Sequence, residues 1–440
     1  MTGFEAEVFQ NQYLATGVDA VDAIVTVRTT GDERAPVRPV ADRGTAAPPS
    51  NSTERVQLIL LDISGSMAEE NGRKMWGAQA ATKAAIETIS DGTLFAVVGG
   101  NHEAHMVYPN VGLARASHQS RTDAKRVVDS LIPGGGTAMG TWLRAAADLV
   151  RRHADGAMAH AILLTDGYNE HETQAQTDAA IEACIGLLQC DARGLGANWN
   201  VDEVRRISSA LLGTVDIIPE PSEMAEVFRQ LTAQSMQREI GSVALRIWMP
   251  KGAEIQLVKQ VAPELFDLSH AAVPVDALNA DYPLGAWSGG EERDYHLRIK
   301  IPVGDVGDER LAARVKLVVD GVEQPVAMVR AVWTDNNALS TRLNREVAHY
   351  TGQAELAEVI HEGLAARDSG DDAVATMKLG RAVQIAHESG NEETIKLLQK
   401  VVDVESAESG TVRLKREVAR ADEMALDVRS VRTVRVGKGD

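Results

Sequence analysis

Residues 54–236 alternate short apolar runs with stretches in which apolar residues recur about every 3.6 positions. The apolar runs predict five strands, at 56–62, 93–100, 159–167, 189–196 and 214–219. The stretches between them predict amphipathic helices at about 73–90, 120–131, 140–153, 173–188, 201–212 and 222–237. Strands alternating with helices are typical of an α/β, doubly wound fold with a mostly parallel sheet. Residues 105–109 predict one further, antiparallel strand.

The pattern changes on both sides of this block. Apolar and polar residues alternate with a period of two, which is typical of half-buried antiparallel strands, at 21–29, 242–249, 295–301 and 313–319. We therefore predict that an α/β domain at 54–237 is inserted into an antiparallel β-sandwich. The sandwich comprises residues 1–30 and 240–335, and a proline-rich linker covers 31–53.

A period of 3.6 returns after Asn337 and predicts a C-terminal α-helical module at 338–408. One helical face comprises Leu339, Leu343, Val347, Tyr350 and Ala354, and further helices are predicted at about 371–388 and 391–407. Residues 409–440 are rich in Lys and Arg and show little apolar periodicity towards the end. We expect them to form a basic, flexible tail.

Composition narrows the possible locations and ligands. The 440 residues carry a formal net charge of -18, and a surface of this sign repels nucleic-acid phosphates and anionic lipids. No apolar run approaches the ~20 residues that span a membrane, and the N-terminus resembles no signal peptide, so we expect a cytoplasmic protein. The two cysteines, Cys184 and Cys190, are too few for a zinc site and are interpreted as buried apolar residues.

Oxygen-bearing side chains gather at predicted strand ends and strand-end loops. Asp62, Ser64 and Ser66 end the first strand, in the stretch LILLDISGSM, and Thr137 and Asp166 lie in later strand-end loops. In an open α/β sheet, the carboxyl ends of the strands form the ligand-binding edge. Carboxylates and hydroxyls suit hard cations such as Mg²⁺, Mn²⁺ or Ca²⁺. Any one of these residues could instead cap a helix or close a turn, but all five together favour a metal site.

These five residues resemble the metal-ion-dependent adhesion site of von Willebrand factor A domains. The family's D-x-S-x-S motif is matched at 62–66, its loop threonine by Thr137, and its second aspartate by Asp166. The resemblance covers about residues 54–236. It implies that Ser64, Ser66 and Thr137 bind Mg²⁺ or a similar ion directly, whereas the two aspartates act mainly through bound water.

The resemblance also implies a function. A cation held by neutral hydroxyls keeps much of its charge and can accept an Asp or Glu carboxylate from a protein partner. The whole arrangement resembles bacterial intracellular proteins that are often linked to MoxR-type AAA+ ATPases or to Ser/Thr kinase and phosphatase systems. We therefore expect a non-enzymatic adaptor, in which the last helix of the α/β domain, at about 222–237, transmits ligand binding.

Two other classes of function remain open from the sequence. A phosphatase of the haloacid dehalogenase type also begins with an aspartate at a strand end, but it needs a second aspartate where this chain has Ser64. The first alternative is nevertheless a metal-dependent phosphoester hydrolase, because the oxygen ligands could also serve such an enzyme. A self-assembling structural protein, whose own carboxylate fills a neighbour's site, is the second.

Two further segments carry candidate chemistry. Asn169, Glu170 and His171 follow Asp166 and either line the rim of the metal site or form an ordinary exposed loop. Thr433 lies among arginines in the basic tail, where a kinase could phosphorylate it, although such tails are more often simply solvated.

Overall fold

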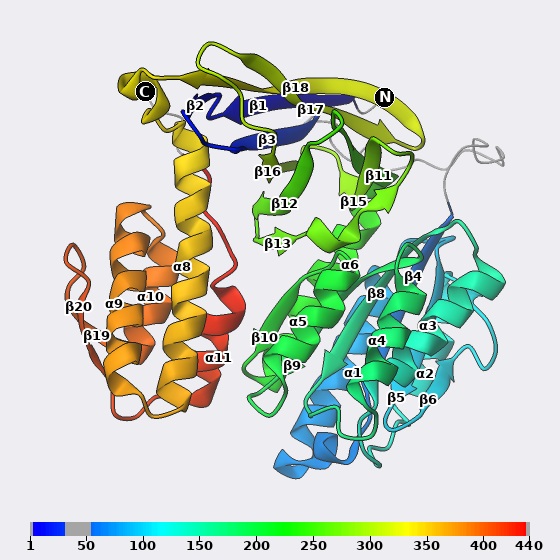
Figure 1. Ribbon diagram of the computed structural model, residues 1–440. Helices are drawn as coiled ribbons and strands as arrows, with labels where there is room; N and C mark the ends of the chain where they lie inside the picture. The colour runs from blue at the N-terminus through cyan, green and yellow to red at the C-terminus, as the bar shows by residue number, and fades with distance from the viewer. Residues whose placement is uncertain (1–2, 31–53, 437–440) are drawn as a thin grey trace. The chain divides into compact units, whose positions relative to one another are not determined.

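The computed structural model describes residues 3–30 and 54–436 and divides into two compact units (Figure 1). One unit comprises Met1–Gly31 and Ser242–Asp440, and the other comprises Asp32–Gly241. We call the second the α/β unit. The predicted proline-rich linker at 31–53 lies outside the described residues.

In its described part, the α/β unit contains a sheet with the strand order β10-β9-β8-β4-β5-β6, and β7 also pairs with β5. The pairings from β10 to β5 are parallel, and β6 is antiparallel to β5, as the run at 105–109 predicted. The strands are β4 (Arg55–Asp62), β5 (Leu94–Gly100), β6 (Ala104–Tyr108), β7 (Ala114–Arg115), β8 (Met158–Thr165), β9 (Leu188–Leu195) and β10 (Val215–Ile218).

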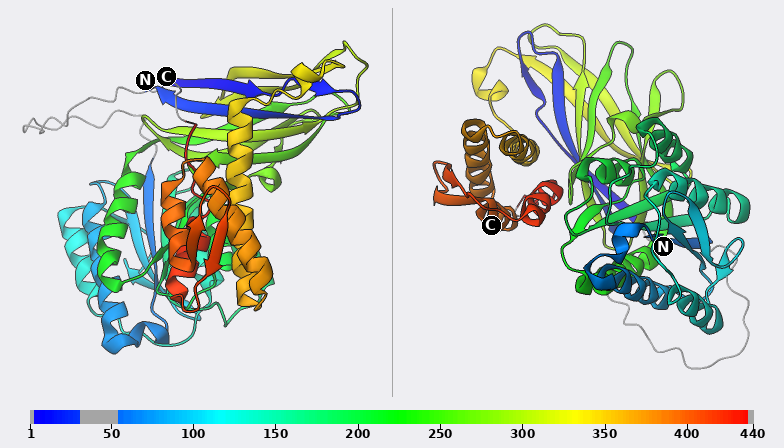
Figure 2. Two further views of the ribbon diagram at one scale, coloured as in Figure 1. Left: turned by 90° about the vertical axis from the view of Figure 1, so that its left-hand side faces the viewer. Right: turned by 90° about the horizontal axis from the view of Figure 1, so that it is seen from below.

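Helices cover both faces of this sheet (Figures 1 and 2). Ile59 and Leu61 of the central strand β4 pack with residues of α1, α2 and α6, whereas Leu58 and Leu60 are buried on the opposite face. A strand buried on both faces favours a continuous apolar run, and this explains residues 58–61 of β4. The helices are α1 (Arg73–Thr88), α2 (His118–Val128), α3 (Met139–His153), α4 (Gln174–Cys184), α5 (Val201–Ala210) and α6 (Met224–Gln237).

The other unit begins with two sheets whose strands come from both ends of the chain. In one sheet β3 (Ala20–Thr30) pairs with β16 (Glu292–Lys300), and in the other β2 (Tyr13–Ala15) pairs with β18 (Val322–Thr334). The predicted insertion of the α/β block into a β-sandwich is therefore confirmed. The remaining strands are β1 (Gly3–Gln10), β11 (Arg238–Trp248), β12 (Glu254–Ala262), β13 (Phe266–Asp267), β14 (Val273–Pro274), β15 (Asn279–Ser288) and β17 (Glu309–Val319).

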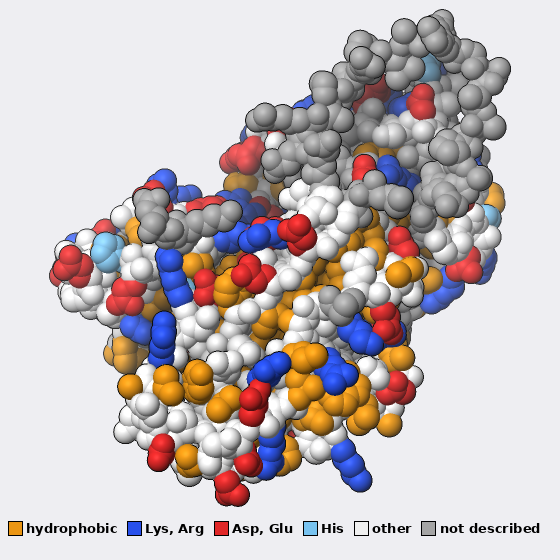
Figure 3. All heavy atoms as spheres, turned by 90° about the horizontal axis from the view of Figure 1, so that it is seen from above, with side chains coloured by type: hydrophobic (Ala, Val, Ile, Leu, Met, Phe, Trp, Pro, Cys, Tyr) orange, Lys and Arg blue, Asp and Glu red, His pale blue; other side chains and the backbone are white. Residues whose placement is uncertain are grey.

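Aromatic side chains fill the space between the two sheets. Phe4 of β1 meets Trp287 of β15 edge to face at 5.6 Å, and the Arg293 guanidinium of β16 lies 4.2 Å from the Trp287 ring. Charged side chains of both signs lie interspersed on the face shown in Figure 3. Ion pairs between β17 and β18, such as Arg330 with Glu309, agree with that mixture.

The helical module follows β18 and departs from the prediction at its start. The helical pattern from Asn337 is divided into α7 (Asn337–Ser340) and α8 (Arg345–Asp368). Asn344 ends the interruption, because its side chain accepts hydrogen bonds from the backbone N–H groups of Glu346 and Val347 and so caps α8. Leu343, which was assigned to the apolar face, lies in this break and is 66% exposed.

Two further predictions were wrong at the end of the module. The helix expected at 391–407 is α10 (Glu392–Val401), after which the chain forms a hairpin of β19 (Val402–Ser406) and β20 (Thr411–Leu414). The flexible tail expected at 409–440 instead contains β20 and α11 (Arg420–Arg429). The preceding helix is α9 (Asp372–Glu388).

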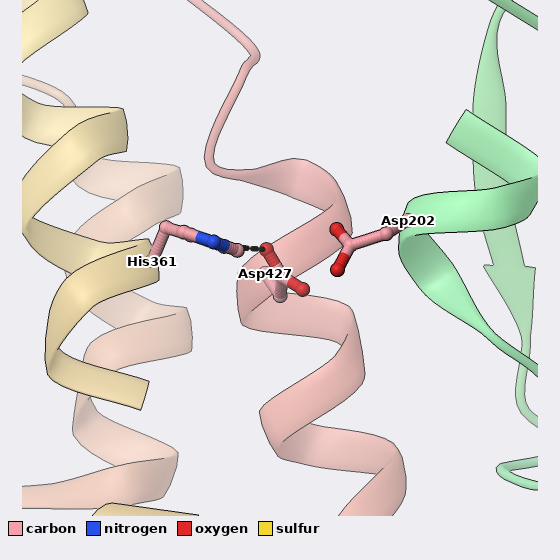
Figure 4. Close-up of side chains that lie close together, drawn as sticks. All are labelled: Asp202, His361 and Asp427. Atoms are coloured by element: carbon pink, nitrogen blue, oxygen red, sulfur yellow. Dashed lines mark ion pairs between the residues drawn. The ribbon is translucent and has the colours of Figure 1, made fainter. Parts of the chain in front are cut away.

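Packing and charge pairing explain the order of α11. Its buried residues are Met424, Ala425, Leu426 and Val428. Its acidic residues face basic side chains of the module: Arg367 pairs with Glu423 at 2.7 Å, and His361 of α8 points toward Asp427 at 3.5 Å (Figure 4). Several of the charged residues that suggested a solvated tail therefore form ion pairs within the module.

The segment after α11 is also tied to the sandwich. Thr433 donates its backbone N–H to the Pro263 carbonyl at 3.0 Å and its hydroxyl to the Val261 carbonyl at 2.7 Å. Phosphorylation of Thr433 stays a prediction. Among the described residues, no helix is both long and apolar enough to cross a membrane.

Candidate metal centre

The carboxyl ends of β4 and β8 place two aspartates side by side. Asp62, the last residue of β4, is fully buried, and its Oδ1 accepts a hydrogen bond from the backbone N–H of Ser64 at 2.8 Å. Its Oδ2 accepts a hydrogen bond from the hydroxyl of Thr165, the last residue of β8, at 2.8 Å. Asp62 is therefore fixed in orientation by its own loop and by the neighbouring strand.

A chain of hydrogen bonds joins the two serines to the second aspartate. The hydroxyl oxygens of Ser64 and Ser66 lie 3.0 Å apart, and the Ser66 hydroxyl donates to Asp166 Oδ1 at 2.6 Å. Asp166 is fully buried, and Ser64 is 2% exposed. The structure thus brings four of the five predicted residues into one connected group.

The fifth residue, Thr137, comes from the glycine-rich loop before α3. The backbone N–H of Gly65 donates to the Gly135 carbonyl at 2.8 Å, so this loop lies directly against the serine loop. A Cβ atom placed on Gly167 would lie 3.3 Å from the Thr137 hydroxyl oxygen and 3.5 Å from that of Ser66. Both hydroxyls therefore face the same glycine, next to Asp166.

The charges in this group are not balanced around Asp62. Burial, together with the nearby charge of Asp166, raises the pKa of Asp62 from 3.8 to about 6. The hydrogen bonds from Ser64 and Thr165 lower the pKa but offset only part of this effect. A buried carboxylate with a raised pKa is one whose negative charge would be stabilised by a cation.

One member of the cluster was missed by the sequence analysis. Lys74 of α1 lies 2.8 Å from Asp166 Oδ2 and 2.8 Å from Glu69 Oε2, and its side chain is only 6% exposed. Burial alone would lower the pKa of Lys74, but the hydrogen bonds and charges of Asp166 and Glu69 outweigh burial and raise it. The available signal was its position, because a lysine falls on the face of α1 that Ala78 and Ala81 also occupy.

The loop after Asp166 contacts the start of α3 as well as the loop that carries Thr137. Asn169 points inward: its Oδ1 accepts the backbone N–H of Met139 at 2.9 Å, and its Nδ2 donates to Glu203 at 2.7 Å. It therefore holds the first turn of α3 and does not line the rim. His171 and Glu170 are exposed, and the backbone N–H of His171 donates to the Thr137 carbonyl at 3.1 Å.

The chemistry of the donor set fits a hard divalent cation. The five residues offer hydroxyl and carboxylate oxygens, which Mg²⁺ prefers to the thiolate and imidazole ligands typical of zinc sites. The two serines and Thr137 would hold the ion, and the two aspartates would orient them. The assignment of the five residues as metal ligands stays a prediction.

Comparison with known proteins identifies the family. Residues 57–217 match the von Willebrand factor type A domain, and residues 384–430 match the von Willebrand factor type A C-terminal domain. A solved structure described as von Willebrand factor type A from Catenulispora acidiphila is 46% identical, and the match covers 99% of this chain and 98% of that one, with a TM-score of 0.89. The chain therefore belongs to the von Willebrand factor type A family. Domains of this family are generally adhesion or protein-interaction modules, and metal binding at a metal-ion-dependent adhesion site is typical of them.

Two further proteins are less similar to this chain. The ArnB paralog VWA2 from Sulfolobus acidocaldarius matches over 98% of both chains with a TM-score of 0.55, and at 13% identity this shows a similar fold alone. An uncharacterized protein of Synechocystis sp. is 27% identical over 222 residues, which are 48% of this chain. The match spans about half of that relative, 49% of its length.

Proposed function

We propose that this chain is a non-enzymatic interaction module that binds a carboxylate of a protein partner through a divalent cation, with Mg²⁺ as the first candidate. The observation that carries the proposal is the connected group of Asp62, Ser64, Ser66 and Asp166, with the Thr137 hydroxyl facing the same glycine as that of Ser66. The complete five-residue site is part of the proposal.

The donor set explains why a partner's carboxylate would bind. Hydroxyl ligands carry no charge, so they leave the cation strongly attractive to an additional anion. The carboxylates of Asp62 and Asp166 already accept hydrogen bonds from Thr165 and Ser66, which favours a role in orienting the ligands. An Asp or Glu of a partner would then supply the missing negative charge.

The proposal of no enzymatic activity rests on the groups next to Asp62. Two residues after Asp62 the chain has Ser64, whereas a phosphatase of the haloacid dehalogenase type has a second aspartate at that position. The nearby imidazole of His171 is also engaged, because its Nδ1 accepts a hydrogen bond from the backbone N–H of Thr137 at 3.4 Å. Mg²⁺-dependent turnover of a phosphomonoester that Asp62→Ala abolishes would instead establish a hydrolase.

The finer assignments stay predictions. A cytoplasmic location is part of the proposal. The link to a MoxR-type AAA+ ATPase or to a Ser/Thr kinase or phosphatase system follows from the resemblance alone.

The proposal is tested by the metal dependence of stability. Mn²⁺ and Mg²⁺ are titrated into the chelator-treated full chain while thermal unfolding is followed. A ligand that binds only the folded state stabilises it by about 3 kcal/mol at a hundredfold excess over its Kd. We expect Thr137→Val, which removes one hydroxyl, to abolish the stabilisation. Thr122→Val, which removes a hydroxyl bound to the His118 carbonyl on the exposed face of α2, should leave it unchanged.

A further inference from the structure

A buried ammonium group lies within the proposed metal centre. Lys74 donates hydrogen bonds to Asp166 Oδ2 and to Glu69 Oε2, both at 2.8 Å. A lysine buried to this extent is rare in proteins, and burial of its charge is costly unless partners compensate for it. Asp166 is the fully buried partner, and the side chain of Glu69 is 57% exposed. The charge of Lys74 is therefore directed mainly at the metal centre.

The backbone before α1 is shaped to bring these groups together. Glu70, Asn71 and Gly72 have positive φ angles of 54°, 57° and 81° in succession. Two successive residues other than glycine in the left-handed region cost free energy, so the surrounding structure must maintain this turn. The turn returns the chain so that Glu69 reaches Lys74 in the first turn of α1.

Lys74 leaves Asp166 without a free oxygen. Ser66 donates to Oδ1 and Lys74 to Oδ2, so both oxygens of this carboxylate are already hydrogen-bonded. The ammonium charge also offsets the charge of Asp166 in part. Asp62 is then the one buried carboxylate of the group whose charge is not matched by a basic side chain among the described residues.

We propose that Lys74 is a positioning residue that sets the charge of the metal centre, weakening the binding of a free dication and strengthening the binding of a carboxylate to the metal-loaded site. The inference rests on the proposed function and deepens it. A dication opposite one unmatched carboxylate keeps a net charge of about +1, whereas without Lys74 the centre would be close to neutral. Metal and partner would then bind cooperatively, because each supplies the charge that the other needs.

A purely structural role would have a different signature. If Lys74 only tied α1 to β8, its removal would lower the stability of the fold and would weaken the metal site by loosening Asp166. The charge-setting role predicts the opposite sign for the metal. The experiment must therefore measure metal and carboxylate affinity separately from stability.

The test uses the full chain with Lys74→Met, which keeps the length of the side chain but removes its charge. Lys74→Arg is the matched control. Free Mn²⁺ is measured by electron paramagnetic resonance, and acetate is titrated into the Mn²⁺-loaded protein while water-proton relaxation reports displacement of metal-bound water. We expect Lys74→Met to bind Mn²⁺ about tenfold more tightly and to need several-fold more acetate, since one unit charge close to the ion is removed. The arginine variant keeps the positive charge and should stay within about threefold of the natural chain in both measurements.

Glu69→Gln provides the opposite perturbation at an exposed residue, which protects the test against misfolding of the methionine variant. It removes a negative charge beside Lys74, so we expect weaker Mn²⁺ binding and stronger acetate binding, each by a few fold. Unchanged or weaker Mn²⁺ binding in a folded Lys74→Met variant would overturn the inference. Shifts of Mn²⁺ affinity in the same direction for Lys74→Met and Glu69→Gln would also overturn it.

The same measurements distinguish failure of the inference from failure of the proposed function. Mn²⁺ binding by the natural chain with no effect of Lys74 retains the function and refutes the inference. Binding by Lys74→Met alone would refute metal dependence in the natural chain while supporting the charge argument. No binding by any variant would refute both.

Discussion

Two buried polar clusters lie on the same strands of the α/β unit and differ in how their charges are balanced. The first surrounds Asp62 at the carboxyl end of β4. The second lies within the sheet, where His160 of β8 contacts Gln57 of β4 through Nδ1 at 3.1 Å and Asp191 of β9 through Nε2 at 2.7 Å.

The two carboxylates respond to burial in opposite ways. Burial raises the pKa of each, but at Asp191 the hydrogen bond and charge of His160 and the charges of Arg193 and Arg238 outweigh burial and hold the pKa well below its usual range. At Asp62 burial and the charge of Asp166 prevail, and the pKa rises to about 6. The protein thus supplies positive charge near Asp191, whereas Asp62 has no basic partner among the described residues, which agrees with the proposed cation site.

The largest effect is expected from removing the balanced carboxylate. Asp191→Ala removes the buried carboxylate that His160, Thr214 and Arg238 contact, and loss of such a buried partner costs about 3–5 kcal/mol. Urea unfolding at pH 7.5 measures the free energy of unfolding. Asp129→Ala is the control, because Asp129 is a 57% exposed partner of Lys83 and its loss should cost below about 1 kcal/mol. Equal losses for the two variants would show that the inner cluster contributes no more than a surface ion pair.

The second effect concerns pH and Asp62. Because its pKa is higher in the folded chain than the usual 3.8, the folded chain binds this proton more tightly, and this contribution to stability is lost as pH rises from about 4 to about 6. The interval corresponds to about 3 kcal/mol. In chelator, Asp62→Asn should therefore be more stable than the natural chain by up to about 3 kcal/mol at pH 7.5 and nearly equal to it at pH 4.

Mg²⁺ should reverse this difference. A cation competes with the proton for Asp62, so Mg²⁺ should stabilise the natural chain more at pH 7.5 than at pH 5 and should not stabilise Asp62→Asn. Urea unfolding at each pH, with and without Mg²⁺, measures both effects. A natural chain with the same pH profile as Asp62→Asn in chelator would mean that the charge of Asp62 is already balanced by the protein.

Of the two clusters, only the proposed metal centre could be anticipated from the sequence. The strand-end positions of Asp62 and Asp166 follow from the alternation of apolar runs and helical patterns, because parallel strands share a ligand-binding edge. Thr137 was also expected in a strand-end loop, but it lies in the loop between α2 and α3. The insertion could also be predicted, since period-two strands on both sides of the α/β block needed a common sheet. Local pattern carried both inferences.

The parts that sequence missed depend on contacts between distant residues. Lys74 meets Asp166 across 92 positions, and His160 meets Asp191 across 31, so no local spacing indicates either pair. The order of α11 had the same cause: Arg367 and Glu423 neutralise each other across 56 positions, whereas the sequence alone shows only a run of charges.

The smallest expected effect concerns the rigidity of the sheet compared with that of the loop that carries Thr137. Substitution of one glycine in each region tests it. A Cβ atom on Gly194 of β9 would lie 1.8 Å from Cε2 of Trp199, which is 1% exposed and donates its Nε1–H to the Gly196 carbonyl. A Cβ atom on Gly136 would lie 1.9 Å from Cε1 of the exposed His171. The tryptophan has no space to move into, whereas the imidazole can turn toward solvent.

We therefore expect Gly194→Ala to lower the free energy of unfolding by about 1–3 kcal/mol, as overpacking in a core does, and Gly136→Ala to lower it by less than about 1 kcal/mol. Gly136→Ala should instead weaken Mn²⁺ binding by several fold, because displacing His171 removes its Nδ1 contact with the Thr137 backbone. Urea unfolding and Mn²⁺ titration measure both variants. Equal destabilisation would mean that the loop carrying Thr137 is as rigid as the core of the sheet. The metal centre would then be preformed on every side, and partner binding could not be coupled to movement of that loop.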